Sequence, residues 1–322
     1  MNASIQEILR NGSMRLKDAL GLEIGSARIE VQCLLQAVLN VDRAWLLSHP
    51  EQTLNDKQLP RYTALVERRL EGEPVAYILG EREFYGLNFI VSPATLIPRP
   101  ETELLVELVL QRVPNPLPAS PTPPGLPLHP QGVRRRVPRC CAATLPQSGE
   151  GQRSDMSAFR VLDLGTGCGA IALSIAQART DIKVVAVDAS QDALLVAREN
   201  AQRLNINNVS MLQSNWYSAL QGERFDLIVS NPPYVASGDA HLTQGDLRFE
   251  PLSALVSGAD GLDDIRHIIT QAKTYLNPGA WLLFEHGHDQ AERARALLQQ
   301  AGFTGILSAC DLAGIERVSG GN

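Results

Sequence analysis

The feature that most constrains the fold is an alternation of short apolar runs and amphipathic segments from residue 159 to residue 301. Runs rich in Val, Ile and Leu are typical of buried strands, and apolar residues recurring at helical spacing are typical of helices. Strands are expected at 160–164, 183–187, 209–212, 225–230 and 281–285, and helices at 168–179, 191–204, 263–276 and 290–301. Repeated β–α–β units predict an α/β domain over residues 158–322 with a doubly wound, mostly parallel sheet. Such sheets bind ligands beyond the carboxyl ends of their strands.

The rest of the chain divides into three further segments. Residues 1–80 predict a small helical N-terminal domain, because apolar residues recur at helical spacing in 27–39 and 56–70. Residues 81–113 predict a short hairpin near 84–91 and a connecting helix over 101–113, with no helix at the prolines of 92–100. Residues 114–157 hold half of the chain's 20 prolines and lack periodicity, so we expect a disordered insertion.

Composition narrows the class of protein. No apolar run approaches the roughly 18–20 residues of a membrane span, and the N-terminus lacks the layout of a signal peptide. We therefore expect a cytoplasmic protein without a membrane partner. The cysteines (Cys33, Cys140, Cys141, Cys168 and Cys310) are too scattered for a disulfide framework or a zinc site, and no metal is expected. A net charge of −6 disfavours a nucleic-acid substrate, which would normally require a basic face.

A glycine-rich loop follows the first strand of the α/β domain. Asp163 and Leu164 end the strand, and Gly165, Thr166 and Gly167 begin a turn that lets the backbone approach a ligand closely. The glycines fit S-adenosylmethionine, but they also fit the loose dinucleotide pattern of an NAD site. Asp163 favours S-adenosylmethionine, because a carboxylate suits the ammonium group of an amino-acid ligand better than a pyrophosphate.

Two residues at the ends of later strands extend this predicted cofactor site. Asp188 ends the second strand, where its carboxylate can accept hydrogen bonds from ribose hydroxyls. Trp216 follows the third strand and offers an apolar face to an adenine ring, although simple packing also accounts for a tryptophan there.

The sequence Asn-Pro-Pro-Tyr directly follows the fourth strand. An amide nitrogen is a poor nucleophile. To attack the methyl group of S-adenosylmethionine, it must be held so that its lone pair faces the methyl carbon. The side-chain oxygen of Asn231 and the carbonyl of Pro232 can each accept one N–H of a planar –NH₂ group, which fixes its plane. Pro232 and Pro233 stiffen the turn, and Tyr234 can stack on the substrate. The same four residues could also form a plain strand-ending turn.

With these motifs the chain resembles the HemK/PrmC family of protein-(glutamine-N5) methyltransferases. The resemblance rests on the runs GEPVAYILGEREFYGLNFIVSPATLIPRPETELLVE (72–107), VLDLGTGCGAIALSIA (161–176), VSNPPYV (229–235), DLRFEPLSALV (246–256) and FEHG (284–287). It implies a class I methyltransferase domain, which is Rossmann-like, behind a helical N-terminal domain. The expected reaction is methylation of the glutamine in the Gly-Gly-Gln motif of class-1 peptide chain release factors.

The resemblance also implies roles for individual residues. The cofactor S-adenosylmethionine would contact Asp163, Leu164, Gly165, Thr166, Gly167, Asp188, Trp216 and Asn231. The substrate glutamine would contact Asn231, Pro232, Pro233 and Tyr234, with Asn231, Pro232 and Tyr234 counted as catalytic.

Three departures from the family pattern are visible. Asn215 stands where relatives commonly have Asp, the 114–157 insertion replaces a short connection, and the glycines near the C-terminus predict a frayed last strand. Two alternatives to the expected function remain open. An adenine-N6 methyltransferase would also present a planar –NH₂, and a non-catalytic module would bind cofactor without transferring its methyl group.

Overall fold

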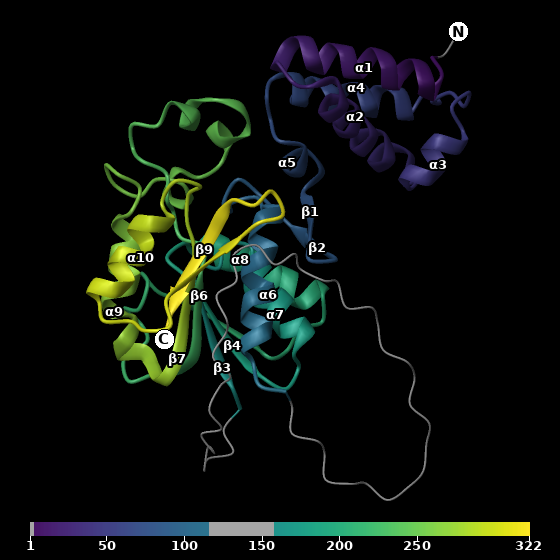
Figure 1. Ribbon diagram of the computed structural model, residues 1–322. Coiled ribbons are helices and arrows are strands. Elements are labelled where there is room, and N and C mark those ends of the chain that lie inside the picture. The colour runs from purple at the N-terminus through teal and green to yellow at the C-terminus, as the bar shows by residue number, and fades with distance from the viewer. Residues whose placement is uncertain (1–2, 116–157) are drawn as a thin grey trace, which may run out of the picture. The chain divides into compact units, whose positions relative to one another are not determined.

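In the computed structural model, which describes residues 3–115 and 158–322, one sheet organises the C-terminal part of the chain (Figure 1). Within residues 158–322 the sheet has seven strands in the order β5-β4-β3-β6-β7-β9-β8. Their bounds are β3 Arg160–Leu164, β4 Lys183–Asp188, β5 Val209–Gln213, β6 Phe225–Ser230, β7 Leu276–Glu285, β8 Leu307–Cys310 and β9 Glu316–Gly321. Strands β3 to β7 pair in parallel, and β9 is antiparallel to both β7 and β8. The predicted mostly parallel, doubly wound sheet is confirmed.

Helices cover both faces of this sheet. The bounds are α6 Glu103–Arg112, α7 Ala170–Ala178, α8 Gln191–Arg203, α9 Asp263–Tyr275 and α10 Ala291–Gln300. Figure 1 shows α9 and α10 on one side of the sheet and α6 and α7 on the other. Buried residues of α9 and α10, such as Ile268 and Leu298, share one core cluster with alternate strand residues such as Leu162 and Phe284. Burial on both faces explains why the strands are apolar runs rather than alternating patterns.

The last strand corrects an expectation from the sequence. We expected residues 316–322 to be frayed, but β9 lies between β7 and β8 and its residues from Val318 to Gly321 are buried. A Cβ at Gly320 would collide with the Leu282 carbonyl oxygen and approach Leu283 Cδ2 to 2.6 Å. The glycine therefore permits close strand packing at this position.

The N-terminal helices have their own core. Their bounds are α1 Ile5–Leu20, α2 Ile24–Leu39, α3 Arg43–Ser48, α4 Gln58–Leu70 and α5 Val75–Leu79. A capping box at Ser4 and Glu7 begins α1, and Gly21 in a left-handed conformation ends it. Apolar side chains of these helices form a separate cluster that includes Leu16, Leu34 and Val66.

Residues 81–102 were predicted less accurately. Strands β1 Glu81–Phe84 and β2 Leu87–Ile90 form a hairpin whose turn is Tyr85–Gly86, both at positive φ, so the first strand begins before the expected 84. Pro100 begins a 3-10 turn, η1 Pro100–Thr102, although no helix was expected at the prolines. A first helical position tolerates proline because its N–H would have no partner there. Further 3-10 turns are η2 Ala240–Thr243, η3 Gly245–Phe249 and η4 Leu252–Ala254.

By contacts, the described residues fall into two compact units. The first comprises Met1–Glu83, Asn88–Ile97 and Gly238–Leu252, and the second comprises Phe84–Leu87, Pro98–Ser237 and Ser253–Asn322. Within the first unit, buried Arg69 holds the 238–252 segment against the helices through ion pairs with Glu30 and Asp246. The predicted domain boundaries at residues 80, 113 and 157 stay predictions. The insertion predicted to be disordered, 114–157, lies from residue 116 onward outside the described residues. None of the described helices is long and apolar enough to cross a membrane.

Candidate functional site

The register of the sheet brings the ends of four strands to one edge. Leu164 of β3 pairs with Val187 of β4 and with Ser230 of β6, and Ser230 also pairs with Phe284 of β7. The residues that directly follow these four paired residues therefore lie side by side across the ends of the strands. These residues are Gly165, Asp188, Asn231 and Glu285. Residues far apart in sequence thus form one row at the carboxyl edge, where parallel sheets bind ligands.

The glycine-rich loop turns sharply over the end of β4. The backbone N–H groups of Gly165 and Thr166 both donate to the Val187 carbonyl at 2.9 Å. Gly167 has φ +57°, and a Cβ there would meet nothing within 4 Å. Glycine at this position is required by backbone conformation rather than by crowding, and it leaves the loop's surface free for a ligand.

Asp163 is a buried carboxylate below this loop. Its Oδ2 accepts a hydrogen bond from Thr166 Oγ1 at 2.7 Å, and its Oδ1 has no partner among residues 3–115 and 158–322. Burial raises the pKa of Asp163 to about 7, and hydrogen bonds from Thr166 and from the Ala172 backbone oppose this rise only in part. A buried oxygen without a donor is a costly arrangement that a bound cation or N–H would relieve.

Asp188 is tied to the loop by backbone donors. Its Oδ2 accepts from the Gly167 N–H and its Oδ1 from the Ser190 N–H, both at 2.8 Å. Burial is the main cause of a raised pKa for this carboxyl. A carboxylate offers about four lone-pair sites, so each oxygen can still accept a ligand hydroxyl.

Leu164 and Trp216 both lie at the start of the glycine-rich loop, but their side chains are placed differently. The Leu164 side chain is fully buried in the core cluster, which leaves its backbone as the part available to a ligand. Trp216 has φ +49° and is partly buried, and its ring carbon Cζ3 would lie 3.5 Å from a Cβ at Gly165. The indole therefore lies over the start of the glycine-rich loop and also packs on the core. The neighbouring Asn215 is exposed.

The Asn-Pro-Pro-Tyr segment is held rigidly after β6. Pro232 and Pro233 are buried, and the Tyr234 carbonyl accepts a hydrogen bond from Gln290 Nε2 at 3.0 Å. Beyond it, Val235 forms a parallel bridge with Val256. These contacts anchor the end of the turn at Tyr234 and Val235, which limits its freedom to move.

Asn231 has a defined amide orientation. Its Nδ2 donates to Thr102 Oγ1 at 3.2 Å, and its Oδ1 is a buried acceptor without a partner in the described part of the chain. An oxygen in this state is suited to accept an N–H from a ligand.

Sequence reasoning missed Thr102 and Glu285. Both are buried, and the Tyr234 hydroxyl donates to Glu285 Oε1 at 3.2 Å. Burial raises the pKa of Glu285 to about 7, and hydrogen bonds from Thr102 and Tyr234 partly oppose this. The available signal was an acidic residue at the end of an apolar strand, because a glutamate is rarely buried unless it is paired.

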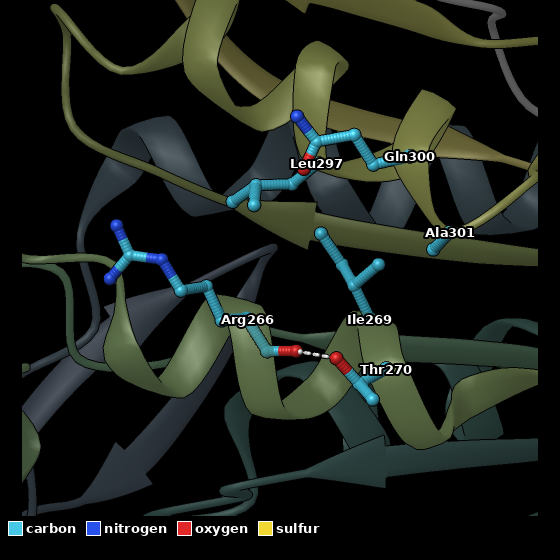
Figure 2. Close-up of a pocket in the computed structure, with 6 residues that line it drawn as sticks. All are labelled: Arg266, Ile269, Thr270, Leu297, Gln300 and Ala301. Carbon is cyan, nitrogen blue, oxygen red and sulfur yellow. Dashed lines mark hydrogen bonds between the residues drawn. The ribbon is translucent and has the colours of Figure 1, made fainter.

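A cavity elsewhere in the second unit takes no part in this row. It has a volume of about 410 Å³ and lies between α9 and α10, lined by Arg266, Ile269, Thr270, Leu297, Gln300 and Ala301 (Figure 2). The strand-end residues described above do not line it. The chemistry-bearing groups therefore gather at the sheet edge rather than at this cavity.

Comparisons with known proteins agree with this arrangement. Residues 7–80 match the family model described as PrmC N-terminal domain, and residues 152–247 match the methyltransferase small domain. A release factor glutamine methyltransferase of Bordetella pertussis is 46% identical over 307 residues, covering 95% of this chain and 98% of the relative. One of Xylella fastidiosa is 45% identical over 294 residues, covering 91% and 92%.

Among solved structures, the catalytic domain of hMettl16 in complex with MAT2A 3'UTR hairpin 6 has a similar fold. The TM-score is 0.50 at 14% identity, and the match covers 80% of this chain and 81% of that one. At this identity the likeness concerns the methyltransferase fold.

Proposed function

This chain belongs to the release factor glutamine methyltransferase family, and we propose that it methylates the glutamine of the Gly-Gly-Gln motif in class-1 peptide chain release factors. The methyl group goes from S-adenosylmethionine to the side-chain amide nitrogen, N5. The observation that carries the proposal is the fixed amide of Asn231, whose buried oxygen has no partner in residues 3–115 and 158–322. Such an oxygen can orient a planar –NH₂ group.

The residues around the glycine-rich loop fit the cofactor. Asp163 Oδ1 would accept from the ammonium group, Asp188 from the ribose hydroxyls, and Trp216 would face the adenine ring. Leu164, Gly165, Thr166 and Gly167 would line the ligand with their backbone. When bound, S-adenosylmethionine supplies an electrophilic methyl group on a sulfonium. The orphaned oxygen of Asp163 supports this assignment, since an ammonium group would stabilise the buried carboxylate.

The residues that follow β6 would hold the substrate glutamine. Asn231 Oδ1 and the Pro232 carbonyl each accept one amide N–H, which leaves the nitrogen lone pair facing the methyl carbon. Pro233 restricts the turn, and the Tyr234 ring packs against the planar amide. Asn231, Pro232 and Tyr234 act on the reacting group directly, whereas strong general-base catalysis is unnecessary, because the methylated product loses its proton easily.

A protein substrate is favoured over the adenine of a nucleic acid. An adenine-N6 methyltransferase must extrude its base at a cost of a few kcal/mol, normally with help from a basic surface. The chain instead carries a net charge of −6. Release factors act with the ribosome, and the protein would work in the cytoplasm beside them. Separately, the helices of residues 1–80 would form a domain of their own.

Methylation of a purified release factor tests the proposal. After incubation with S-adenosylmethionine, peptide mapping should place one methyl group on the glutamine of Gly-Gly-Gln. Transfer to RNA or DNA and not to the release factor would contradict the proposed substrate. Cofactor binding without any transfer would indicate a non-catalytic module.

The role of Asn231 is tested by single-turnover kinetics. Asn231→Ala should slow transfer by about a hundredfold, on the order of 3 kcal/mol, with little loss of substrate affinity, because the lost acceptor aligns the transition state. Asn231→Asp should also be slow, since its negative charge stabilises the sulfonium before transfer. The control is Asn207→Ala, at an exposed residue after α8, which should transfer at the wild-type rate. If both Asn231 variants transfer the methyl group at the wild-type rate, Asn231 is only a turn residue.

A further inference from the structure

Thr102, Glu285 and Tyr234 form a partly buried hydrogen-bonded network with Asn231. Asn231 Nδ2 donates to Thr102 Oγ1 at 3.2 Å, and the Tyr234 hydroxyl donates to Glu285 Oε1 at 3.2 Å. The Thr102 hydroxyl also hydrogen-bonds with the Glu285 carboxyl. Thr102 is 4% exposed and Glu285 is 2% exposed, so water does not compete for these groups.

Three separate parts of the chain supply this network. Thr102 is the last residue of η1 and precedes α6, Asn231 follows β6, and Glu285 ends β7. The pairing of Ser230 with Phe284 puts Asn231 and Glu285 level at the end of adjacent strands. The network therefore depends on the assembled sheet.

The chemistry of the carboxylate sets the direction of every hydrogen bond in the chain. Burial raises the pKa of Glu285 to about 7, so at pH 8 the carboxyl is mostly ionised and can only accept. At that pH the hydroxyls of Thr102 and Tyr234 both give their hydrogen atoms to Glu285. Thr102 Oγ1 then has lone pairs left for Asn231, and the Asn231 –NH₂ turns toward it. The other end of that amide is the Oδ1 atom, which has no partner in the described residues.

We propose that Thr102 and Glu285 are positioning residues that fix the Asn231 amide with its oxygen toward the substrate. The two ends of an asparagine amide have nearly the same shape, and local hydrogen bonds decide between the two orientations. The wrong orientation would present a donor to the substrate N–H and repel it. This inference rests on the proposed function, because the orientation matters for a substrate that offers N–H groups.

Thr102→Val tests the inference, because valine keeps the shape of threonine and removes the hydroxyl. Single-turnover methyl transfer to the release factor should slow by roughly tenfold to a hundredfold, with affinity for cofactor and release factor changed less than about threefold. Thr102→Ser should restore most of the rate. Thr270→Val is the matched control, since that hydroxyl donates to the Arg266 carbonyl on the exposed face of α9 (Figure 2) and should not affect transfer.

A double-mutant cycle links the effect to Asn231. If Thr102 acts through Asn231, adding Thr102→Val to Asn231→Ala should slow transfer less than about twofold further. Full multiplication of the two single effects would overturn the inference.

Glu285→Gln separates positioning from structural support. The glutamine amide can donate to Thr102 Oγ1, so that the Thr102 hydroxyl donates to Asn231 instead of accepting from it. This reversal should slow transfer about as much as Thr102→Val. Burial raises the pKa of Glu285 to about 7, so removing this carboxylate should leave the melting temperature at pH 8 unchanged or higher. A purely structural residue would lose stability and activity together.

The outcomes are distinct. A wild-type enzyme that transfers no methyl group to the release factor overturns the proposed function, and this inference with it. If the wild-type enzyme transfers the methyl group and Thr102→Val transfers it equally fast, the inference alone is overturned. The inference is also overturned alone if Thr102→Val is slow and Thr102→Ser is just as slow.

Discussion

Asp163 should make the stability of the ligand-free protein depend on pH. Its side chain is fully buried, and burial raises its pKa to about 7 from an ordinary value of 3.8. Because the folded-state pKa lies above the unfolded one, this group's stabilising contribution is complete below about pH 4 and is lost as pH rises through about 7. Asp163→Asn cannot ionise and should not show this loss.

The pKa difference sets the size of the effect. A rise from 3.8 to about 7 corresponds to about 4 kcal/mol of folding free energy lost by the wild type at pH 8. Only about 3 kcal/mol of this is lost between pH 5 and pH 8, because the unfolded-state carboxyl is already ionised at pH 5. For a domain of this size that equals a melting-temperature change of roughly 6–12 °C. The asparagine leaves a buried –NH₂ group without a partner, which costs about 1–3 kcal/mol at every pH. The melting temperature of the variant relative to wild type should therefore rise between pH 5 and pH 8.

Thermal unfolding at the two pH values measures this difference. Glu199→Gln, which removes an exposed carboxylate from α8, is the control and should show nearly the same offset from wild type at both. Saturating S-adenosylmethionine should raise the wild-type melting temperature more at pH 8 than at pH 5, since its ammonium group pairs with ionised Asp163. An Asp163→Asn offset that is equal at pH 5 and pH 8 would refute the reasoning.

Two further predictions concern neighbouring features. Asp188→Ala should weaken S-adenosylmethionine binding by roughly 1.5–3 kcal/mol in calorimetry, because the carboxylate that also anchors the Gly167 N–H is lost; unchanged affinity would remove Asp188 from the site. Gly320→Ala should destabilise the protein by about 1–3 kcal/mol in urea unfolding, because the new Cβ collides with the Leu282 carbonyl. Gly238→Ala, where a Cβ meets nothing within 4 Å, is its control, and equal stability of the two variants would contradict the packing argument.

The sequence predicted the centre of the parallel sheet well because the central strands β3 and β6 are buried on both faces. Strands β3 and β6 have the predicted bounds, and β4 and β5 extend one residue further. Strand β7 begins at Leu276, well before the expected 281. Strong apolar runs such as 160–164 and 225–230 leave little choice of structure, and a turn residue after each run marks its end. The residues singled out at those ends therefore lie on one edge of the sheet.

Contacts between distant segments could not be predicted in the same way. The partners Thr102 and Asn231 are separated by 129 positions, and nothing local distinguishes Thr102 from an ordinary residue at the start of a helix. Glu285 ends a predicted strand, but only the pairing of Ser230 with Phe284 places it level with Asn231. The last strand was misjudged because glycines usually weaken strands, whereas Gly320 relieves a close approach between two of them.

The position of β9 has a consequence for how the sheet assembles during synthesis. Strands β7 and β8 both leave the ribosome before β9, yet β9 lies between them. Until residues 316–321 emerge, β7 exposes an unpaired edge and β8 has no neighbour in the described sheet, so this half of the sheet closes late. Strand pairing that depends on a segment made later is slow. A nascent chain stalled before residue 316 would expose the unpaired edge of β7, which could pair with chaperones or with other copies of the chain.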